Sequence, residues 1–493
     1  MEKKLFSRKL IRPESHALVV GLGKSGLSAV NFLNSIRVRV SVSDASSMDR
    51  INGHIVQKLG KKVETLETGG HSEKLFTSVD FIVVSPGVPL DIPALKSAYK
   101  KGIPVIGELG LAACCLKTPL VAVTGTNGKS TVVTLLGELF QASGKKIFVG
   151  GNIGTPLTDY LVGPQDADVV VAEVSSFQLD IAGEFRPNVA VLLNISPDHL
   201  DRYNSYEAYV ASKFRIFAFQ GPGDLAVLNA DDPEIMRHER KNCFSGKALE
   251  LNKIDKINRH QNNRLFFGDR LQGENGASLN GRKIVLSGGG APSGNEEIYD
   301  LNHTSLAAGP NLQNAMPAII AARHMGCCES GIQKGIAGFV PLPHRLAMVA
   351  EIRGVRYYDD SKATNVGAVH SALTCMKSPV ILIAGGRDKG GEYVMLNELI
   401  RKKVKAMVLI GEAGAGMAEA FESLTSVKSA DTLPDAVHKA SNMACSGDAV
   451  LLSPACSSFD MFNDYAQRGR VFREAVNSLP GSSQYSIDGL GID

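Results

Sequence analysis

The sequence predicts a three-domain α/β protein, and two features support that prediction. The chain has 493 residues, and single hydrophobic cores stop growing at roughly 250–300 residues, so two or three domains are needed. An apolar strand followed at once by a glycine-rich turn occurs three times, as HALVVGLGKSG (16–26), LVAVTGTNGKS (120–130) and VILIAGGRDKG (380–390). Each of these stretches is typical of the opening of an α/β unit.

Proline and glycine interrupt the pattern of strands and helices at GIPVIGELG (102–110) and GFVPLPHRL (338–346). Each segment so delimited is expected to hold a mainly parallel sheet with helices on both faces. The Gly-, Asn- and Ser-rich stretch 268–298 is expected to form a surface hairpin and loop of the middle domain. The predicted domains are a Rossmann-like N-terminal domain (1–108), a central P-loop-type domain (109–341) and a C-terminal Rossmann-like domain (342–493).

The composition indicates a soluble, cytoplasmic protein, with neither nucleic acid nor a membrane as its main partner. Hydrophobic residues make up 44% of the chain and charged residues 21%, and the formal net charge is only +3. No apolar run approaches the ~18 residues of a membrane span, and the basic start MEKKLFSRKL lacks the apolar core of a signal peptide. The eight cysteines show no spacing suited to zinc, so we expect free, buried thiols in a reducing cytosol.

The first glycine turn has the spacing GxGxxG, with Gly21, Gly23 and Gly26 after an apolar strand and Asp44 at the end of the next one. In a dinucleotide-binding fold such an acid binds the ribose, so this turn alone would suggest an NAD-dependent oxidoreductase. The turn does not select NAD, however, because a tight turn at a helix amino end faces a diphosphate whichever nucleotide carries it. A purely structural turn is the alternative.

The second glycine turn, TGTNGKST, resembles a phosphate-binding loop that is two residues short, since Val123 stands where the first glycine is normally found. Lys129 is placed at the helix start, where its ammonium can reach the outer phosphates of a nucleotide. Ser130 or Thr131 offers a hydroxyl to Mg²⁺, which prefers oxygen ligands. A helix cap followed by a solvated lysine is the alternative reading.

Lys213 lies on a helical face that is expected to be buried. A helix is predicted from about Ser205, and on it Lys213 shares a face with Tyr209 and Val210, and with Ile216 and Phe217 beyond. Either the lysine stem reaches outward to water, or its nitrogen has a task inside. Burial favours the neutral amine, and a neutral amine can add carbon dioxide to become a carbamate, which is an oxygen ligand for metal.

Three further residues follow apolar strands in positions where α/β active sites project their side chains. Asp198 and His199 follow VAVLLNIS, and Glu173 ends the strand in DVVVAEVSS. With a modified Lys213, Glu173 and His199 would make a plausible set of ligands for two Mg²⁺ ions beside a triphosphate. Each of these residues taken alone is more often structural.

The carboxy-terminal stretch GDAVLLSPACSSFDMF is predicted to be a strand followed by a helix, with Ser458 near the helix start. A hydroxyl and backbone N–H groups at that position can bind a carboxylate. Lys362 and Lys389 supply the opposite charge, so an acidic amino acid is a natural guest. Two solvated surface lysines are the alternative.

Seven motifs together resemble the Mur ligase family of peptidoglycan synthesis, and in particular its D-glutamate-adding members. The resemblance runs from about residue 17 to 475, with the motifs in the family's order. They are GTNGKST, GGNIGTPL, EVSSFQL, NISPDHLDRY…AYVASKFRIF, PHRLAMV, DDSKATN and LLSPACSSFDMFNDYAQRGRVF.

The resemblance implies ATP as co-substrate, two Mg²⁺ ions and a carbamylated lysine, with catalytic roles for Lys129, His199, Lys213 and Arg345. The metal ligands it implies are Ser130, Glu173, His199 and the carbamate of Lys213. The ATP-binding residues it implies are Gly125, Thr126, Asn127, Gly128, Lys129, Ser130, Thr131, Asn311, Asn314, Arg345 and Asp360. For the UDP-linked substrate they are Lys24, Ser25, Asp44, Ser85, Pro86, Gly87, Asn152 and Ser175. For D-glutamate they are Lys362, Thr364, Lys389, Ser458, Phe459 and Tyr465.

The expected activity is therefore ATP-dependent addition of D-glutamate to UDP-N-acetylmuramoyl-L-alanine through an acyl phosphate, by a monomer. Closure of the third domain is expected to bring Arg345 and the glutamate pocket onto ATP. Three alternatives remain open at this point: a Mur ligase or folylpolyglutamate synthetase for another substrate, a nicotinamide oxidoreductase, and a non-catalytic nucleotide switch.

Overall fold

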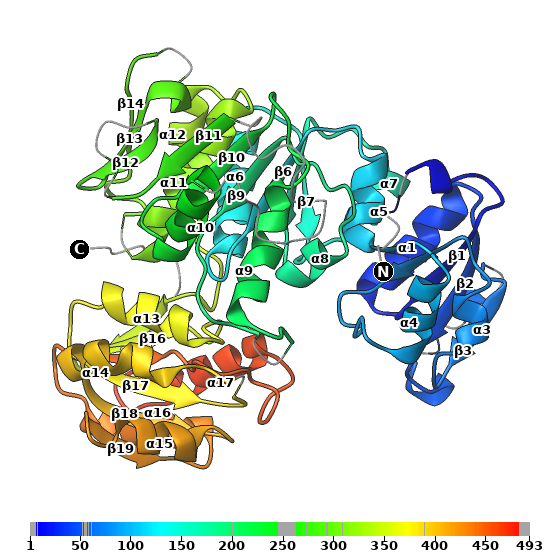
Figure 1. Ribbon diagram of the computed structural model, residues 1–493. Coiled ribbons are helices and arrows are strands. Elements are labelled where there is room, and N and C mark those ends of the chain that lie inside the picture. Colours follow the sequence, from blue (N-terminus) through cyan, green and yellow to red (C-terminus); the bar gives the residue numbers. More distant parts are fainter. Residues whose placement is uncertain are drawn as a thin grey trace.

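The computed structural model shows three α/β bodies that follow one another along the chain (Figure 1). Each of its three sheets lies inside one of the three predicted domains, which confirms the fold class, while the exact boundaries after 108 and 341 stay predictions. No helix among the described residues is both long and apolar enough to cross a membrane. The structure describes residues 6, 8–51, 53, 57, 59, 60, 62–199, 202–244, 263–269, 271, 275–291, 294–307, 309–388 and 390–482.

The first domain is a five-stranded, fully parallel sheet in the order β3-β2-β1-β4-β5. Buried β1 residues such as Leu18 and Val20 face one hydrophobic cluster, while Ala17 and Val19 face another, so helices cover both faces. Its elements are β1 (His16–Val20), α1 (Lys24–Ser35), β2 (Arg39–Asp44), β3 (Thr65–Thr68), α3 (Glu73–Phe76), β4 (Phe81–Val84), α4 (Pro93–Lys100) and β5 (Val105–Gly107), with short 3₁₀ turns at Arg8–Leu10 and Met48–Arg50.

The first glycine turn connects β1 to α1 by a very close backbone approach. Gly21 has φ +90°, a conformation that favours glycine. A Cβ on Gly26 would lie only 1.9 Å from the Gly21 carbonyl oxygen, whereas a Cβ on Gly23 would meet nothing within 4 Å. Two of the three glycines are therefore required by the turn itself.

Gly26→Ala is expected to destabilise the first domain by about 1–3 kcal/mol, because the added methyl group overpacks against backbone that cannot move aside freely. Gly23→Ala is the matched control, since it makes the same chemical change in open space. Denaturant unfolding of the two variants compares them directly. Equal unfolding free energies would show that the turn tolerates the extra atom.

The central domain is a nine-stranded sheet in the order β14-β13-β12-β11-β10-β9-β6-β8-β7. Its strands are parallel from β7 to β12, and β13 pairs antiparallel with both β12 and β14. Its strands are β6 (Leu120–Thr124), β7 (Ile147–Gly151), β8 (Val169–Glu173), β9 (Val189–Leu192), β10 (Leu225–Asn229), β11 (Asn263–Phe267), β12 (Gly276–Asn280), β13 (Lys283–Ser287) and β14 (Glu297–Asp300). Its helices are α5 (Glu108–Cys115), α6 (Lys129–Ala142), α7 (Leu157–Val162), α8 (Ser176–Asp180), α9 (Tyr206–Phe214), α10 (Pro233–Phe244), α11 (Pro310–His324) and α12 (Glu329–Gly338), with 3₁₀ turns at Arg215–Phe217 and Gly288–Gly290.

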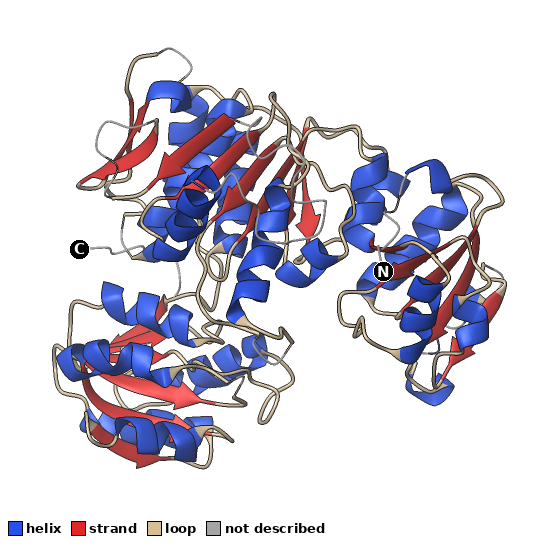
Figure 2. Cartoon of the chain, viewed as in Figure 1, coloured by secondary structure: helices blue, strands red, loops and turns tan. Residues whose placement is uncertain are grey.

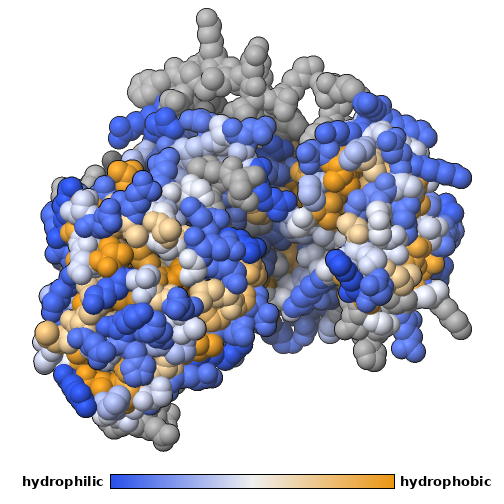
Figure 3. Space-filling model, turned by 90° about the horizontal axis from the view of Figure 1, so that it is seen from below, coloured by the Kyte–Doolittle hydropathy of each residue, from blue (hydrophilic) through white to orange (hydrophobic). Residues whose placement is uncertain are grey.

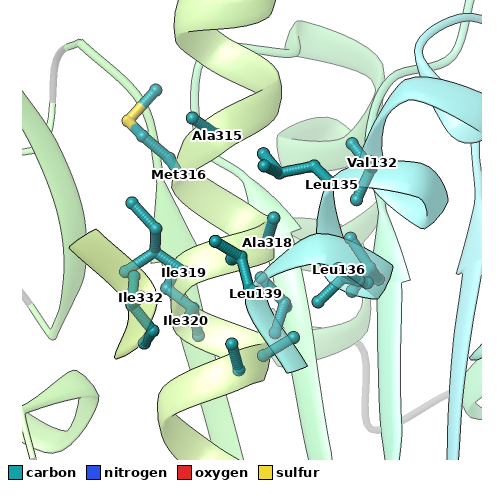
Figure 4. Packing of buried hydrophobic residues seen from close by; sticks show 14 of the residues in the cluster. Val132, Leu135, Leu136, Leu139, Ala315, Met316, Ala318, Ile319, Ile320 and Ile332 are labelled. Atoms are coloured by element: carbon teal, nitrogen blue, oxygen red, sulfur yellow. The ribbon is translucent and has the colours of Figure 1, made fainter. Parts of the chain in front are cut away.

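Strand β6 separates two cores, which fixes the position of the loop that follows it. Val121 and Val123 face the cluster formed with α6, α11 and α12, while Leu120 and Ala122 face the cluster shared with the first domain. In the first of these clusters, Leu135 and Leu139 of α6 lie against apolar side chains of α11 (Figure 4). Helix α6, whose amino end forms the phosphate loop, is thus held by deep packing on its apolar side.

The Gly-, Asn- and Ser-rich stretch contains the predicted hairpin, because β12 and β13 pair antiparallel. It is more than a surface feature, however. Ala277, Ile284 and Leu286 are fully buried in the central core, and β14 adds a further strand at the edge of the sheet. The alternation of apolar and polar residues in the hairpin provides this buried face.

The C-terminal domain is a six-stranded sheet in the order β15-β16-β20-β17-β18-β19, with only β15 antiparallel. Helices cover both of its faces (Figure 2). Its elements are β15 (Ala347–Ile352), β16 (Val355–Asp359), α13 (Val366–Cys375), β17 (Val380–Gly385), a 3₁₀ turn (Tyr393–Leu396), α14 (Asn397–Lys403), β18 (Val404–Ile410), α15 (Gly414–Phe421), β19 (Ser426–Ser429), α16 (Leu433–Met443), β20 (Ala449–Leu452) and α17 (Tyr465–Asn477).

The outer domains contact the central domain differently. The first domain shares a hydrophobic cluster with it, and Ser28 of α1 is hydrogen-bonded to Thr158 of α7 (2.6 Å). The C-terminal domain meets it through polar contacts, including Arg345 to Ser130 (2.7 Å). Seen from below, the two outer domains stand on either side of a recess (Figure 3).

The seven cysteines whose side chains the structure describes are free thiols. Cys327 and Cys456 are buried, but Cys328 and Cys445 are exposed, so the expectation that the thiols are buried is wrong for these two. Cys328 stands at the N-cap position of α12 without a side-chain capping bond, and Cys445 lies in the turn after α16, where a small side chain needs no burial.

Candidate functional site

The phosphate loop, residues 125–131, joins the carboxyl end of β6 to the amino end of α6. Gly125 has φ +150° and Gly128 φ +85°. A Cβ on Gly125 would lie 2.9 Å from the Leu193 side chain, and one on Gly128 would lie 2.5 Å from the Asn314 amide oxygen. Both glycines are therefore needed for conformation and for space, and the short loop is held close to the neighbouring segments.

Lys129 is the first residue of α6, and its side chain folds back over the loop. Its Nζ donates hydrogen bonds to the carbonyl oxygens of Gly125 and Thr126, both at 2.8 Å. Burial lowers the pKa of the amine, while the carboxylates of Glu173 and Asp198 act in the opposite direction. The alternative of a solvated lysine is therefore wrong, because the amine is held inside the loop among acidic neighbours.

Lys213 reaches the same carbonyl oxygen from helix α9. The residue is only 2% exposed, and its Nζ donates to the oxygen of Gly125 (3.0 Å) and lies 4.7 Å from the centre of the Tyr209 ring. Burial, and then the charge of Lys129, lower the pKa of the Lys213 amine well below its ordinary value. The predicted inward orientation is confirmed, and the environment favours the neutral amine that carbamate formation requires.

Glu173, at the end of β8, has one carboxylate oxygen satisfied and one not. Its Oε1 accepts a hydrogen bond from Asn152 Nδ2 (2.8 Å), whereas Oε2 is buried without a hydrogen-bond partner in the described structure. A buried carboxylate oxygen without a donor is unfavourable. A cation placed there would satisfy it, so Glu173 fits the role of a metal ligand.

His199 follows β9 in a strained loop conformation, with φ +56°. Its Nε2 lies 3.6 Å from Asp198 Oδ2, and its ring contacts that of Phe177 edge-on at a centroid distance of 4.9 Å. Within the described residues, no three His, Cys, Asp or Glu side chains gather as a ready metal cage.

Arg345 brings the C-terminal domain to the phosphate loop, since its Nη2 donates to the hydroxyl of Ser130. Asp360, at the end of β16, lies in the same region. Its carboxylate accepts hydrogen bonds from Leu346 N (3.1 Å) and Ser453 Oγ (2.8 Å). Burial raises the pKa of Asp360 to about 7.

Asp360→Asn is expected to flatten the pH dependence of stability between about pH 4 and pH 7. In that range the native state keeps a proton that the unfolded chain has lost, so the free energy of unfolding falls as the pH rises, by at most about 4 kcal/mol. Urea unfolding of wild type and variant at several pH values measures this, with Asp166→Asn as a control at a carboxylate that is 64% exposed. Parallel curves for wild type and Asp360→Asn would contradict it.

Two predicted nucleotide residues lie on helix α11, beside the loop. Asn314 is buried against Gly128, and Asn311 Nδ2 donates to the carbonyl oxygen of Ser305 (3.4 Å). Asn314 is therefore brought to the phosphate loop, while Asn311 stands about one helical turn before it. Their common helix, α11, packs against α6.

The residues predicted for the UDP-linked substrate lie around the first glycine turn and across the junction to the central domain. Asp44 accepts hydrogen bonds from the backbone of Leu22 (2.6 Å) and Ser46 (2.7 Å), and Ser85 donates to Gly21 O (2.9 Å). Lys24 crosses the junction and donates to the carbonyl oxygen of Gly154. Ser25 is the second residue of α1, after Lys24, and Pro86 and Gly87 continue the turn from Ser85. In the central domain, Asn152 and Ser175 lie near Gly154 and Glu173.

The predicted D-glutamate residues are partly assembled. Lys362 Nζ lies 3.7 Å from the centre of the Tyr465 ring, and Thr364 follows on the same loop. Ser458 is buried and Phe459 is 65% exposed. Lys389 lies outside the described residues.

The predicted helix at Ser458 is wrong. After β20 the chain runs through bends and turns as far as α17, which begins at Tyr465. Ala455 has φ +62°, and Ser457 exchanges backbone hydrogen bonds with Arg387 at 3.0 Å in both directions. The bridge holds the chain in an extended conformation just before Ser458, and the backbone bonds that follow, from Met461 N (3.2 Å) and Phe462 N (2.8 Å) to Ser458 O, close a single turn.

Three residues that the sequence analysis missed organise the site. Asn194 and Asn365 hold the phosphate loop from two sides, and the fully buried Arg468 donates to the carbonyl oxygens of Ser361 (2.9 Å) and Cys456 (3.1 Å). Asn194 had a usable signal, because it follows an apolar strand in the same way as His199. Asn365 precedes the helical pattern of α13 and could have been read as its cap.

Comparison with known proteins gives three family matches in chain order: the Mur ligase MurD-like N-terminal domain (residues 15–107), the Mur ligase middle domain (123–322) and the Mur ligase glutamate ligase domain (344–456). The chain is 41% identical over 463 residues to a UDP-N-acetylmuramoylalanine--D-glutamate ligase of Syntrophus aciditrophicus, covering 94% of this chain and 97% of that one. It is 43% identical to the ligase of the same name from Desulfosudis oleivorans, covering 94% and 96%.

Solved structures share the fold. A pseudomurein peptide ligase type C from Methanothermus fervidus aligns with a TM-score of 0.56 at 21% identity, covering 94% of this chain and 99% of that one. MurF ligase from Thermotoga maritima, solved in complex with ADP, aligns with a TM-score of 0.55 at 17% identity, covering 96% and 99%. At these identities the likeness concerns the three-domain architecture.

Proposed function

Because the chain belongs to the Mur ligase family, we propose that it joins D-glutamate to UDP-N-acetylmuramoyl-L-alanine at the expense of ATP, in the cytoplasmic synthesis of peptidoglycan precursors. One observation carries the chemistry: Lys129, Lys213 and Arg345 converge on a single phosphate loop from two domains. The proposal adopts the activity named for relatives that match nearly the whole chain.

The reaction has two steps. The terminal alanine carboxylate of the UDP-linked substrate attacks the γ-phosphorus of ATP, forming an acyl phosphate and releasing ADP. The amine of D-glutamate then attacks the acyl carbon, the C–O bond to phosphate breaks, and the amine loses a proton. Both steps build negative charge on oxygens, so positioning and charge neutralisation are the main catalytic needs.

Different residues supply the positioning and the charge neutralisation. Lys129 faces the β- and γ-phosphates from the loop, and Arg345 adds a second cation from the C-terminal domain. Glu173, His199, Ser130 and a carbamylated Lys213 would hold Mg²⁺, which supplies further charge neutralisation at the phosphates. Glu173 with its unpartnered oxygen fits this role well.

The substrates are proposed to bind at opposite sides of that centre. The UDP group would lie on the first glycine turn, with Lys24, Ser25, Asp44, Ser85, Pro86 and Gly87, and its lactoyl-alanine arm would reach Asn152 and Ser175. D-glutamate would lie near Lys362, Thr364, Ser458, Phe459 and Tyr465, with Lys389. Asn311, Asn314 and Asp360 would hold ATP. A monomer carries all of these groups, and sedimentation velocity would test that state.

Phosphate release from ATP tests the proposal. Purified protein with Mg²⁺ and UDP-N-acetylmuramoyl-L-alanine is expected to release phosphate with D-glutamate and not with L-glutamate, L-lysine or no amino acid. Release with another amino acid would identify a different ligase of the family. Release independent of any amino acid would support a nucleotide switch.

A further inference from the structure

Asn365 joins the C-terminal domain to two separate loops of the central domain. The residue is 9% exposed, and its side chain caps α13, because Oδ1 accepts a hydrogen bond from Ala368 N (2.8 Å). The same amide faces that of Asn127 in the phosphate loop, with both N–O pairs at 3.3 Å. Its Nδ2 also donates to Asp198 Oδ2 (2.9 Å). One side chain thus contacts the phosphate loop and the loop that carries His199.

Both partners of Asn365 are fixed within the central domain. Asn127 is held by Asn194, which accepts from Asn127 N (2.8 Å) and donates to its carbonyl oxygen (3.1 Å). Asp198 accepts a hydrogen bond from His199 N (2.9 Å) through its other oxygen. A change in either loop is therefore transmitted to the position of Asn365.

The backbone beside this contact is closely apposed to the central domain. A Cβ on Gly367 would lie 2.5 Å from the Ser196 hydroxyl and 3.3 Å from Asn127 Nδ2. Glycine at this position lets the first turn of α13 approach the loops. The contact is therefore formed by the polar side chain of Asn365 and, beside it, by the backbone of Gly367.

We propose that Asn365 is a positioning residue that couples the seating of the C-terminal domain to the phosphate loop and to the Asp198–His199 loop. Lys362 and Thr364 lie on the same loop immediately before Asn365, so anchoring Asn365 places the proposed D-glutamate pocket. The position of the proposed D-glutamate pocket therefore depends on the phosphate loop and on the Asp198–His199 loop. This inference rests on the proposed function.

Only an amide satisfies the contacts at this position. The oxygen must accept from Ala368 N, and the nitrogen must donate to a carboxylate. Serine can keep the cap but is too short to reach Asp198. Aspartate also keeps the cap but places a second carboxylate against Asp198, and like charges in contact are strongly unfavourable.

The test uses Asn365→Ser and Asn365→Asp in the full-length protein. The KM for D-glutamate is expected to rise about tenfold in the first and about a hundredfold in the second, with the KM for the UDP-linked substrate unchanged. Both variants keep a capping oxygen, and thermal melting confirms that they are folded. A KM for D-glutamate equal to that of wild type in both variants would overturn the inference.

A charge exchange separates coupling from general damage. The double variant Asn365→Asp with Asp198→Asn restores a donor–acceptor pair, so its KM for D-glutamate is expected within about threefold of that of Asp198→Asn alone. A KM for D-glutamate in the double variant as high as that of Asn365→Asp alone would also overturn the proposal.

Small-angle X-ray scattering provides a readout that does not need turnover. With Mg²⁺ and a non-hydrolysable ATP analogue, wild type is expected to have a smaller radius of gyration than Asn365→Asp and than the wedge variant Gly367→Leu. If wild type showed no D-glutamate-dependent turnover, the proposed function would fail while scattering still decided this inference. Identical radii for wild type and both variants would overturn it.

Discussion

Replacing Lys129 with alanine is expected to lower D-glutamate-dependent phosphate release by at least about a thousandfold in a protein that stays folded. The amine lies over the phosphate loop, bonded to two of its carbonyl oxygens. When phosphates occupy the loop, this amine can turn towards them. Loss of the charge leaves the γ-phosphate without its nearest cation as negative charge develops.

Lys146→Ala is the matched control. Lys146 directly precedes β7, is 72% exposed and pairs with Asp166 on the surface (3.2 Å). The same truncation there is expected to change turnover less than about twofold, because exposed ion pairs contribute little. Binding of the UDP-linked substrate, measured by calorimetry, should be unaffected in both variants. Lys129→Ala turnover within tenfold of wild type would contradict the proposed role.

The phosphate loop was predictable from sequence because its determinants are local. A buried strand, two glycines, a lysine and an amphipathic helix follow one another within about twenty residues, and neighbouring side chains fix the outcome. Lys213 was predictable for a similar reason: helical spacing alone places it with Tyr209 and Val210 on the apolar face. The helical period of the apolar residues is therefore enough to predict that Lys213 is buried.

The segment around Ser458 shows where local reasoning fails. Its composition permits a helix, but the backbone pairs instead with Arg387, some 70 residues earlier, and Arg468 binds Cys456 O from helix α17. Such partners are set by the tertiary fold. The pairing of Asn365 with Asn127, which are 238 residues apart, likewise cannot be predicted from the motif around either residue.

Replacing Lys213 with methionine is expected to lower turnover by about a hundredfold or more without loss of stability. Methionine has a similar length and fills the buried site, while it removes an amine whose burial disfavours the charged form. Thermal melting and phosphate release together measure the two effects. A large drop in melting temperature would mean that the amine serves the fold.

Lys213→Ala distinguishes a carbamate from a simple cation. Alanine leaves a space in which acetate or formate can take the place of a carbamate. Short carboxylates are therefore expected to raise the turnover of this variant at least about tenfold. The methionine variant fills that space and should not respond. Full activity of Lys213→Ala without added carboxylate, or equal rescue of both variants, would exclude the carbamate.

The pH dependence of stability tests the same group in the absence of metal and bicarbonate. The pKa of the Lys213 amine is lowered on folding, so at pH values between the folded-state pKa and the ordinary 10.5 the unfolded chain binds a proton that the native state does not. The free energy of unfolding should therefore rise with pH across this window, by about 1.4 kcal/mol for each pKa unit of difference. Lys213→Met lacks the titrating group and should show a smaller slope. Equal slopes would mean that the amine stays charged in the native state, and a charged ammonium cannot add carbon dioxide.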